Sequence, residues 1–282
     1  MTDIRREPAV SGLFYPDDAH ELKNLVEISF KDNKFGPGHL PPSNNSLKIY
    51  GIVSPHAGYI YSGAIAANGF YEISSSQFDA AVTIGPNHYG LGSDIALMER
   101  GKWISPLGEI SIDNEISRLL YNESKFINYD SFAHSKDHCI EVQVPFIQYI
   151  NKSCTLVPMI LGRQDEEVSN RIGECIYEVS KLTSKKIMLI ASSDLTHYLP
   201  NNMAHEKDNA LISSILSLDV SKFYSTLQRY EVNACGYGAI GTIMKATKEL
   251  GATKGKLLKY ATSGDVLGDT NSVVGYSSII FI

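Results

Sequence analysis

Three apolar segments of the sequence are each followed at once by side chains that can bind a metal or move a proton. Neutral imidazole binds zinc, iron, copper and nickel, and two His with one carboxylate are typical of non-haem iron sites. A lone His at a strand end is more often a hydrogen-bonded loop residue. The prediction of a metal site therefore depends on finding such residues after three different strands. If the segments are adjacent parallel strands, the groups that follow them meet in one cleft. These segments and groups are 47–53 with His56, 80–84 with His88, and 187–191 with Asp194 and His197.

Cys235 follows Asn233-Ala234 and precedes Gly236 and Gly238, just ahead of a predicted helix over 236–250. The helix dipole stabilises thiolate at such a position and lowers the thiol pKa, and thiolate is the form that binds metal or attacks an electrophile. The alternative, a small buried apolar cysteine, remains equally open for Cys235 and is preferred for Cys139, Cys154 and Cys175. No pair has the C-x-x-C spacing, and four cysteines are too few for a disulfide scaffold.

The segment 133–141 carries two histidines and two carboxylates. Within it, His134 and His138 are four residues apart, and so are Asp137 and Glu141, so that each pair shares a face if the segment is helical. Such groups can orient metal-bound His or act as general acids and bases. The alternative is a helix that begins at Ser135 or Asp137 with a solvated first turn.

The elements that must position these residues alternate between strand and helix. This alternation predicts an α/β fold with a doubly wound, mostly parallel sheet flanked by helices, and no linker divides residues 1–282, which predicts a single domain. The strands near 94–98 and 109–112 are expected to add an antiparallel edge, the segment 140–150 is ambiguous, and 262–270 predicts a turn before the last strand. The other expected strands are 47–53, 80–84, 155–161, 187–192, 257–262 and 273–282, and the expected helices are 17–30, 62–73, 114–122, 165–182, 204–216, 220–228 and 236–250.

Composition excludes several classes of function. The chain has 282 residues, 43% of them hydrophobic and 20% charged, and a net charge of −6, so it can bury a sizeable core. It has no clustered Lys/Arg surface for nucleic acid, no apolar run long enough to span a membrane, and no apolar leader near its first residues. We therefore expect a cytoplasmic protein with reduced thiols that binds neither nucleic acid nor membrane.

Six motifs, in order along nearly the whole chain, resemble the Memo family, whose animal member was named as a mediator of ErbB-driven cell motility. The ending, from Ser263-Gly264-Asp265 to Gly275-Tyr276, looks like the prokaryotic branch. The resemblance implies a fold similar to the LigB-type class III extradiol dioxygenases, which are non-haem iron enzymes. The motifs are Pro8-Ala9-Val10-Ser11-Gly12-Leu13-Phe14-Tyr15-Pro16, Pro55-His56-Ala57-Gly58-Tyr59, Gly85-Pro86-Asn87-His88, Asp137-His138-Cys139-Ile140-Glu141-Val142-Gln143-Val144-Pro145-Phe146, Ser192-Ser193-Asp194-Leu195-Thr196-His197-Tyr198 and Cys235-Gly236.

The resemblance also implies a set of site residues. The metal ligands that it implies are His56, His88 and Cys235, where Cys235 stands in the place of a dioxygenase carboxylate. A thiolate makes the site softer and favours iron or copper, with zinc possible. Relatives are found beside a radical-SAM protein and an AMMECR-type protein, which implies a functional link to both. The residues that we expect to act as acids, bases or orienting groups are Asp194, His197, His138 and Glu141.

Three functions follow as hypotheses. The first is a metal-dependent, oxidoreductase-like protein that performs redox or dioxygen chemistry on an unknown substrate. The second is a non-enzymatic module that binds a peptide or partner in the same cleft; animal relatives are associated with phosphotyrosine peptides, but no Arg cluster for a phosphate is apparent here. The third is hydrolysis by a zinc-bound water.

Overall fold

The computed structural model describes residues 4–43 and 46–282. Its strands are β1 (Arg5–Arg6), β2 (Gly51–Ser54), β3 (Ala80–Pro86), β4 (Ile95–Leu97), β5 (Lys102–Ser105), β6 (Gly108–Ser111), β7 (Asn128–Tyr129), β8 (Thr155–Leu161), β9 (Ile187–Ser192), β10 (His197–Leu199), β11 (Gly255–Thr262) and β12 (Val273–Phe281). Its helices are α1 (Ala19–Lys31), α2 (Tyr59–Ile73), α3 (Asn114–Glu123), the 3₁₀ turn η1 (Glu141–Gln143), α4 (Val144–Ile150), α5 (Glu166–Leu182), α6 (Asn201–Leu216), α7 (Val220–Tyr230), α8 (Tyr237–Glu249) and α9 (Ser263–Leu267).

A nine-stranded sheet crosses the molecule, in the order β10-β12-β2-β9-β3-β8-β4-β7 with β11 also paired to β12. The four central strands β2, β9, β3 and β8 are parallel to their neighbours, and they are joined to antiparallel pairings at both sides. The expected α/β, mostly parallel sheet is therefore confirmed. Parallel neighbours need crossover connections, which the intervening helices supply.

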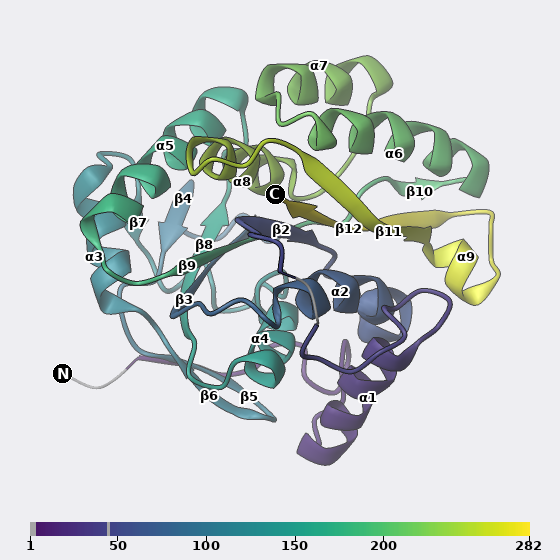
Figure 1. The fold of residues 1–282 in the computed structure, drawn as a ribbon, viewed down its shortest axis with the longest axis horizontal. Helices are drawn as coiled ribbons and strands as arrows, with labels where there is room; N and C mark the ends of the chain where they lie inside the picture. Colours follow the sequence, from purple (N-terminus) through teal and green to yellow (C-terminus); the bar gives the residue numbers. More distant parts are fainter. Residues whose placement is uncertain (1–3, 44–45) are drawn as a thin grey trace.

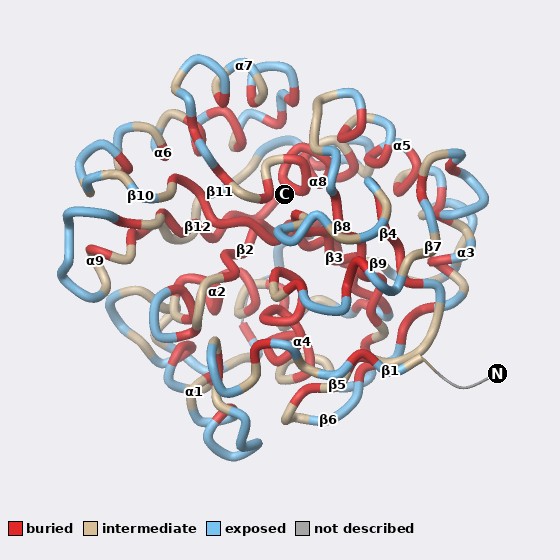
Figure 2. Tube along the Cα trace, turned by 180° about the vertical axis from the view of Figure 1, so that it is seen from behind, coloured by how far each residue is buried: buried red, intermediate tan, exposed pale blue. Residues whose placement is uncertain are grey.

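Helices cover both faces of this sheet (Figure 1). On one face α8 packs on β2, β3 and β9, with α5 against α8; on the other, α2 packs on β2 and β12, with α1 against α2. The central strands are buried along nearly their whole length (Figure 2). Successive side chains of β3 enter different cores: Val82 and Ile84 on the α8 face, Ala81 on the α2 face. This two-sided burial explains why these strands read as continuous apolar runs.

Aspartates begin several of the helices. Asp18 accepts hydrogen bonds from the first N–H groups of α1, and Asp113, Asp165 and Asp219 do the same for α3, α5 and α7. The carboxylates satisfy backbone donors that have no partner within the helix and oppose the positive end of its dipole. Among the described residues, no helix combines the length and the apolar character needed to cross a membrane.

Three local expectations need correction, and one segment that the sequence left ambiguous is resolved. Only the strand near 94–98 joins the main sheet as an antiparallel edge, because β6 pairs with β5 in a separate sheet with β1. Helix α2 begins after Gly58 rather than at Ser62, whose hydroxyl instead donates to the Ala57 carbonyl. The segment 140–150 is helical, and 262–270 contains the short helix α9, whose capping box joins Thr262 and Asp265.

Candidate metal centre

The strand order places the carboxyl ends of β2, β9 and β3 side by side, because β9 lies between the other two and all three run parallel. His56, Asp194 and His88 follow these three ends, and all of them line one cavity of about 460 Å³. The expected convergence of the three strand ends therefore occurs. The cavity is lined by Leu13, Phe14, His56, Ala57, Gly58, Tyr61, His88, His138, Asp194, His197, Tyr198, Ser263, Val274 and Tyr276.

A chain of hydrogen bonds fixes the buried His56 ring. The Ser192 hydroxyl donates to the Cys139 carbonyl at 2.5 Å and accepts from Gln143 Nε2 at 2.8 Å. Because its one proton is thus committed, Ser192 Oγ accepts at 3.0 Å from His56 Nδ1, which must carry the ring proton. The lone pair of the neutral ring is then on Nε2, and burial, followed by the nearby His138, keeps the His56 pKa well below its usual value.

His88 is oriented by Asp137. Its Nδ1 lies 3.0 Å from one carboxylate oxygen, and its backbone N–H donates to the other at 2.7 Å. Burial alone would raise the Asp137 pKa, but His88 and neighbouring N–H groups reverse this and hold it well below its usual value. An ionised carboxylate on Nδ1 leaves Nε2 as the ligand atom, which is the arrangement typical of metal-bound His.

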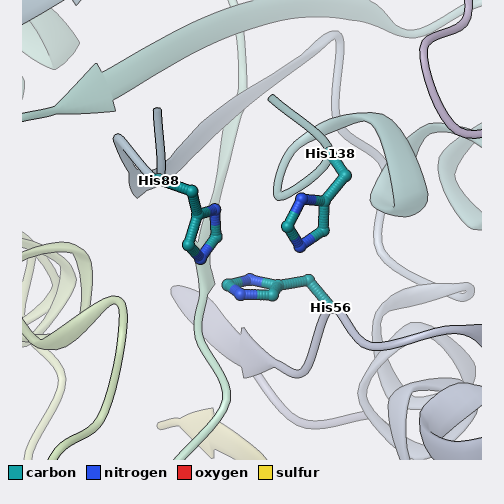
Figure 3. Close-up of side chains that lie close together, drawn as sticks. All are labelled: His56, His88 and His138. Carbon is teal, nitrogen blue, oxygen red and sulfur yellow. The ribbon is translucent and has the colours of Figure 1, made fainter. Parts of the chain in front are cut away.

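His138 completes a cluster of three imidazoles. One ring nitrogen from each of His56, His88 and His138 lies within 4.8 Å of the others, as a shared metal ion requires, and the rings converge in Figure 3. The His138 ring stacks on His88 with centroids 4.6 Å apart and packs against Phe14 at 4.7 Å. Burial, followed by His88, lowers the His138 pKa to about 4, so the ring is neutral and able to coordinate.

Cys235 also reaches this cluster, but not as an exposed thiolate. Its sulfur lies 3.0 Å from His56 Nε2 and accepts from the Asp194 N–H at 3.3 Å. Helix α8 does begin just after it, yet burial, followed by the charge of Asp194, raises the thiol pKa far above its usual value. The expectation of a lowered pKa was therefore wrong, because desolvation of the charged sulfur outweighs the helix dipole. A metal would have to displace the thiol proton.

Asp194 and His197 also line the cavity. Asp194 accepts from the His56 N–H at 2.8 Å, and burial raises its pKa to about 7, so it can gain or lose a proton near neutrality. His197 Nδ1 lies 3.2 Å from the Asn233 carbonyl, which must accept from it, so that His197 Nε2 is left for a ligand. Both residues line the cavity, in keeping with an acid–base role.

Glu141 and His134 are not among the described residues that line the cavity. The segment 134–140 is a series of turns rather than a helix, so the two expected pairs do not share a face. Glu141 is buried in an ion pair with Arg6 and accepts hydrogen bonds from the Tyr15 hydroxyl and two backbone N–H groups. His134 is buried against Trp103.

Several contributors were not singled out from the sequence. Asp137, Ser192 and Gln143 orient the two imidazoles. All three lie in the motifs of the family resemblance, and Asp137 is also part of the polar segment 133–141. Cavity size is no guide either, since a larger hollow of about 980 Å³ lies between α1, the turn at 106–109 and the end of α4. It contains none of the His cluster, so donor chemistry rather than volume identifies the candidate site.

Comparison with known proteins identifies the family. The family described as "Memo-like protein" matches residues 6–280. A MEMO1 family protein of Nitrosopumilus maritimus is 46% identical over 98% of this chain and 99% of its own length. MEMO1 family proteins of Methanopyrus kandleri and Desulfurococcus amylolyticus are 41% and 42% identical, over 99% and 98% of this chain and 99% of their own lengths. Such likeness over almost the whole length shows that this chain belongs to the Memo family.

Proposed function

We propose that this protein binds a transition metal at the His cluster and uses it for redox or dioxygen chemistry on a small ligand. The observation that carries the proposal is the pair His56 and His88. Each has its Nδ1 hydrogen bonded and its Nε2 left as a lone-pair donor, at the ends of the two strands that flank β9. His138 and Cys235 are the two candidates for a third ligand, since both approach His56.

The donor set suits iron or copper, with zinc as the alternative. Imidazole and thiolate are ligands for all three metals, whereas magnesium and calcium prefer oxygen. Iron or copper in this place would supply electron transfer and activation of dioxygen, and zinc would supply a Lewis acid.

The chain's own residues would bind the ligand and move its protons. Asp194, with a pKa of about 7, would take a proton from the ligand or return it, and His197 Nε2 would do the same from the adjacent position. Phe14 packs on His138 at the cavity wall and would shield that imidazole from water.

Elemental analysis of protein purified without chelator tests the proposal. We expect close to one iron, copper or zinc per chain, and its loss in a His56→Ala/His88→Ala variant. The matched control is His20→Ala, because His20 is exposed on α1 and outside the cavity. Equal and negligible metal in all three proteins would overturn the proposal, and stoichiometric zinc in a colourless protein would favour hydrolysis.

A partner-binding role is the second candidate, and the exposed apolar residues Leu13 and Tyr198 at the cavity favour it. Its proposed partners are the radical-SAM and AMMECR-type proteins. Pull-down with each, by the wild type and a Cys235→Ser variant, tests it. Equal capture of a partner by the wild type and by Cys235→Ser supports a binding module. Capture that is lost when the metal site is altered argues for the first proposal.

A further inference from the structure

Another cavity, which we call the tyrosine cavity, lies where three helices meet. The beginning of α5, the helix α7 and the beginning of α8 enclose about 470 Å³, and these helices pack against one another (Figure 1). It shares no lining residue with the cavity of the His cluster. Its volume is that of a small-molecule site, and the function proposed above makes no use of it.

Two tyrosine rings form a corner of this cavity. Tyr224 of α7 and Tyr237 of α8 have ring centroids 6.1 Å apart and ring planes at 82°. The Tyr224 hydroxyl donates to the Gln164 carbonyl at 2.7 Å and lies 2.7 Å from Ser169 Oγ, so this ring is held in place before any ligand binds. Two rings at right angles can both contact one positive charge, as in the aromatic cages that bind ammonium groups.

A carboxylate without an ion-pair partner lies in the same lining. Three acids in a row, Asp165, Glu166 and Glu167, begin α5, where the helix dipole favours negative charge. Arg163 pairs with the carboxylates of Asp165 and Glu167. Glu166, which is half-buried, lines the tyrosine cavity and forms no ion pair among the described residues. A carboxylate beside aromatic rings attracts a cation.

The rest of the lining is apolar or uncharged. Leu227 and Val232 supply apolar side chains, and Ser225 and Gln228 are neutral. Of the described residues that line this cavity, none is Lys, Arg or His. An anion would therefore be repelled, whereas a cation with an apolar body would match both parts of the lining.

We infer that the tyrosine cavity binds a small organic ammonium ion. The positive nitrogen would lie between the Glu166 carboxylate and the Tyr224 and Tyr237 rings. The carbon body of the ligand would pack on Leu227 and Val232. This binding goes beyond the proposed function and needs no metal. Contact of a cation with one ring, or pairing with one partly exposed carboxylate, changes a dissociation constant by about 2- to 5-fold.

Choline and 3,3-dimethylbutan-1-ol test the inference, because they share a shape and differ in charge. A quaternary nitrogen has no lone pair and both molecules carry the same hydroxyl, so a metal in the other cavity cannot favour choline. In an NMR titration of the full chain at millimolar ligand, we expect choline to bind more tightly than the alcohol or the anion 3,3-dimethylbutanoate. No measurable binding of choline, or equal binding of choline and the alcohol, would overturn the inference.

Substitutions in the lining show where choline binds. Glu166→Gln removes the charge and Tyr237→Leu removes a ring, and each should weaken choline binding by about 2- to 5-fold. Tyr237→Phe should retain binding, because phenylalanine keeps the ring face. Glu167→Gln is the matched control, since Glu167 lies in the same turn of α5 but does not line the cavity. If folded Glu166→Gln and Tyr237→Leu both bind choline like the wild type, the inference is wrong.

The His56→Ala/His88→Ala variant separates this inference from the metal proposal. It should bind choline like the wild type, since the two cavities share no lining residue. Loss of choline binding in the folded variant would place the ammonium at the His cluster and contradict the inference. A chain that takes up no metal but binds choline through Glu166 contradicts the metal proposal alone.

Discussion

His56 and His88 are both oriented with Nε2 free to bind a metal, but their Nδ1 atoms have different partners. A neutral hydroxyl accepts from one Nδ1 and a carboxylate from the other. The carboxylate adds negative charge to the ring that it orients and so raises the basicity of the remaining nitrogen. His88 should therefore depend on its partner more strongly than His56 does.

The first prediction at this scale concerns Asp137. Asp137→Asn should weaken metal binding by about 10- to 100-fold, as loss of an orienting partner commonly does. Competition with a metal indicator measures this. The control is Asp265→Asn, because Asp265 accepts from His205 in a comparable pair that does not line the cavity. Equal affinity in wild type and Asp137→Asn would show that the pair does not tune the site.

The second prediction concerns His134, whose pKa burial, followed by Arg6, lowers to about 4. Since the unfolded chain binds this proton at a pKa near 6.5 and the folded chain does not, stability is present above that pH and is lost as pH falls toward 4. Urea unfolding should show this decline. In His134→Gln the slope against pH should be smaller by up to about 1.4 kcal/mol per pH unit. An unchanged slope would mean that His134 does not contribute.

At the scale of elements, the N-terminal segment 6–15 is bound to the turn that carries His138. Glu141 accepts from Arg6, from the Ala9 and Val10 N–H groups at 2.8 and 3.0 Å, and from the Tyr15 hydroxyl at 2.6 Å. Arg6 also donates to the carbonyls of residues 134 and 137. Phe14, in the same segment, packs against His138. We propose that Glu141 positions this segment rather than acts as an acid or base at the cavity.

The prediction at this scale is that Glu141→Gln lowers the free energy of unfolding by about 3–5 kcal/mol, because Arg6 is left as an unpaired buried charge. Chemical denaturation measures the loss. Glu109→Gln is the control, since Glu109 pairs with Arg5 and Lys102 on the exposed surface, where ion pairs contribute little. Full stability of Glu141→Gln together with altered proton transfer would restore the acid–base interpretation.

At the scale of the whole molecule, the candidate ligands come from distant parts of the chain. His56 follows β2, His88 follows β3 and Cys235 follows α7, whereas His138 lies within the turns at 134–140. Only the folded chain brings them together. A metal that binds all of them binds the folded state alone, so its binding free energy adds to stability.

Thermal unfolding tests this coupling. Free metal at about one hundred times its dissociation constant should stabilise the protein by about 2.7 kcal/mol, and chelator should reverse the effect. His56→Ala/His88→Ala should unfold at the same temperature with and without metal. A metal-dependent shift that persists in this variant would place the metal elsewhere on the chain.

The sequence by itself determined the strand–helix alternation and the residues at three strand ends, because both depend on local pattern. Apolar runs bounded by Gly and Pro predict buried strands, and aspartates mark helix starts. The single domain, the dioxygenase-like fold and the catalytic roles of Asp194 and His197 stay predictions.

Only the tertiary structure decided the rest, because it depends on contacts between distant residues. Burial reversed the pKa shift expected for Cys235, and Glu141 pairs with Arg6 instead of lining the cavity. His138 is part of the His cluster and His134 is not, because the segment between them forms turns rather than a helix. Strand β10 has a bulge at Tyr198 that exists only through pairing with β12, so the sequence carried no local sign of it.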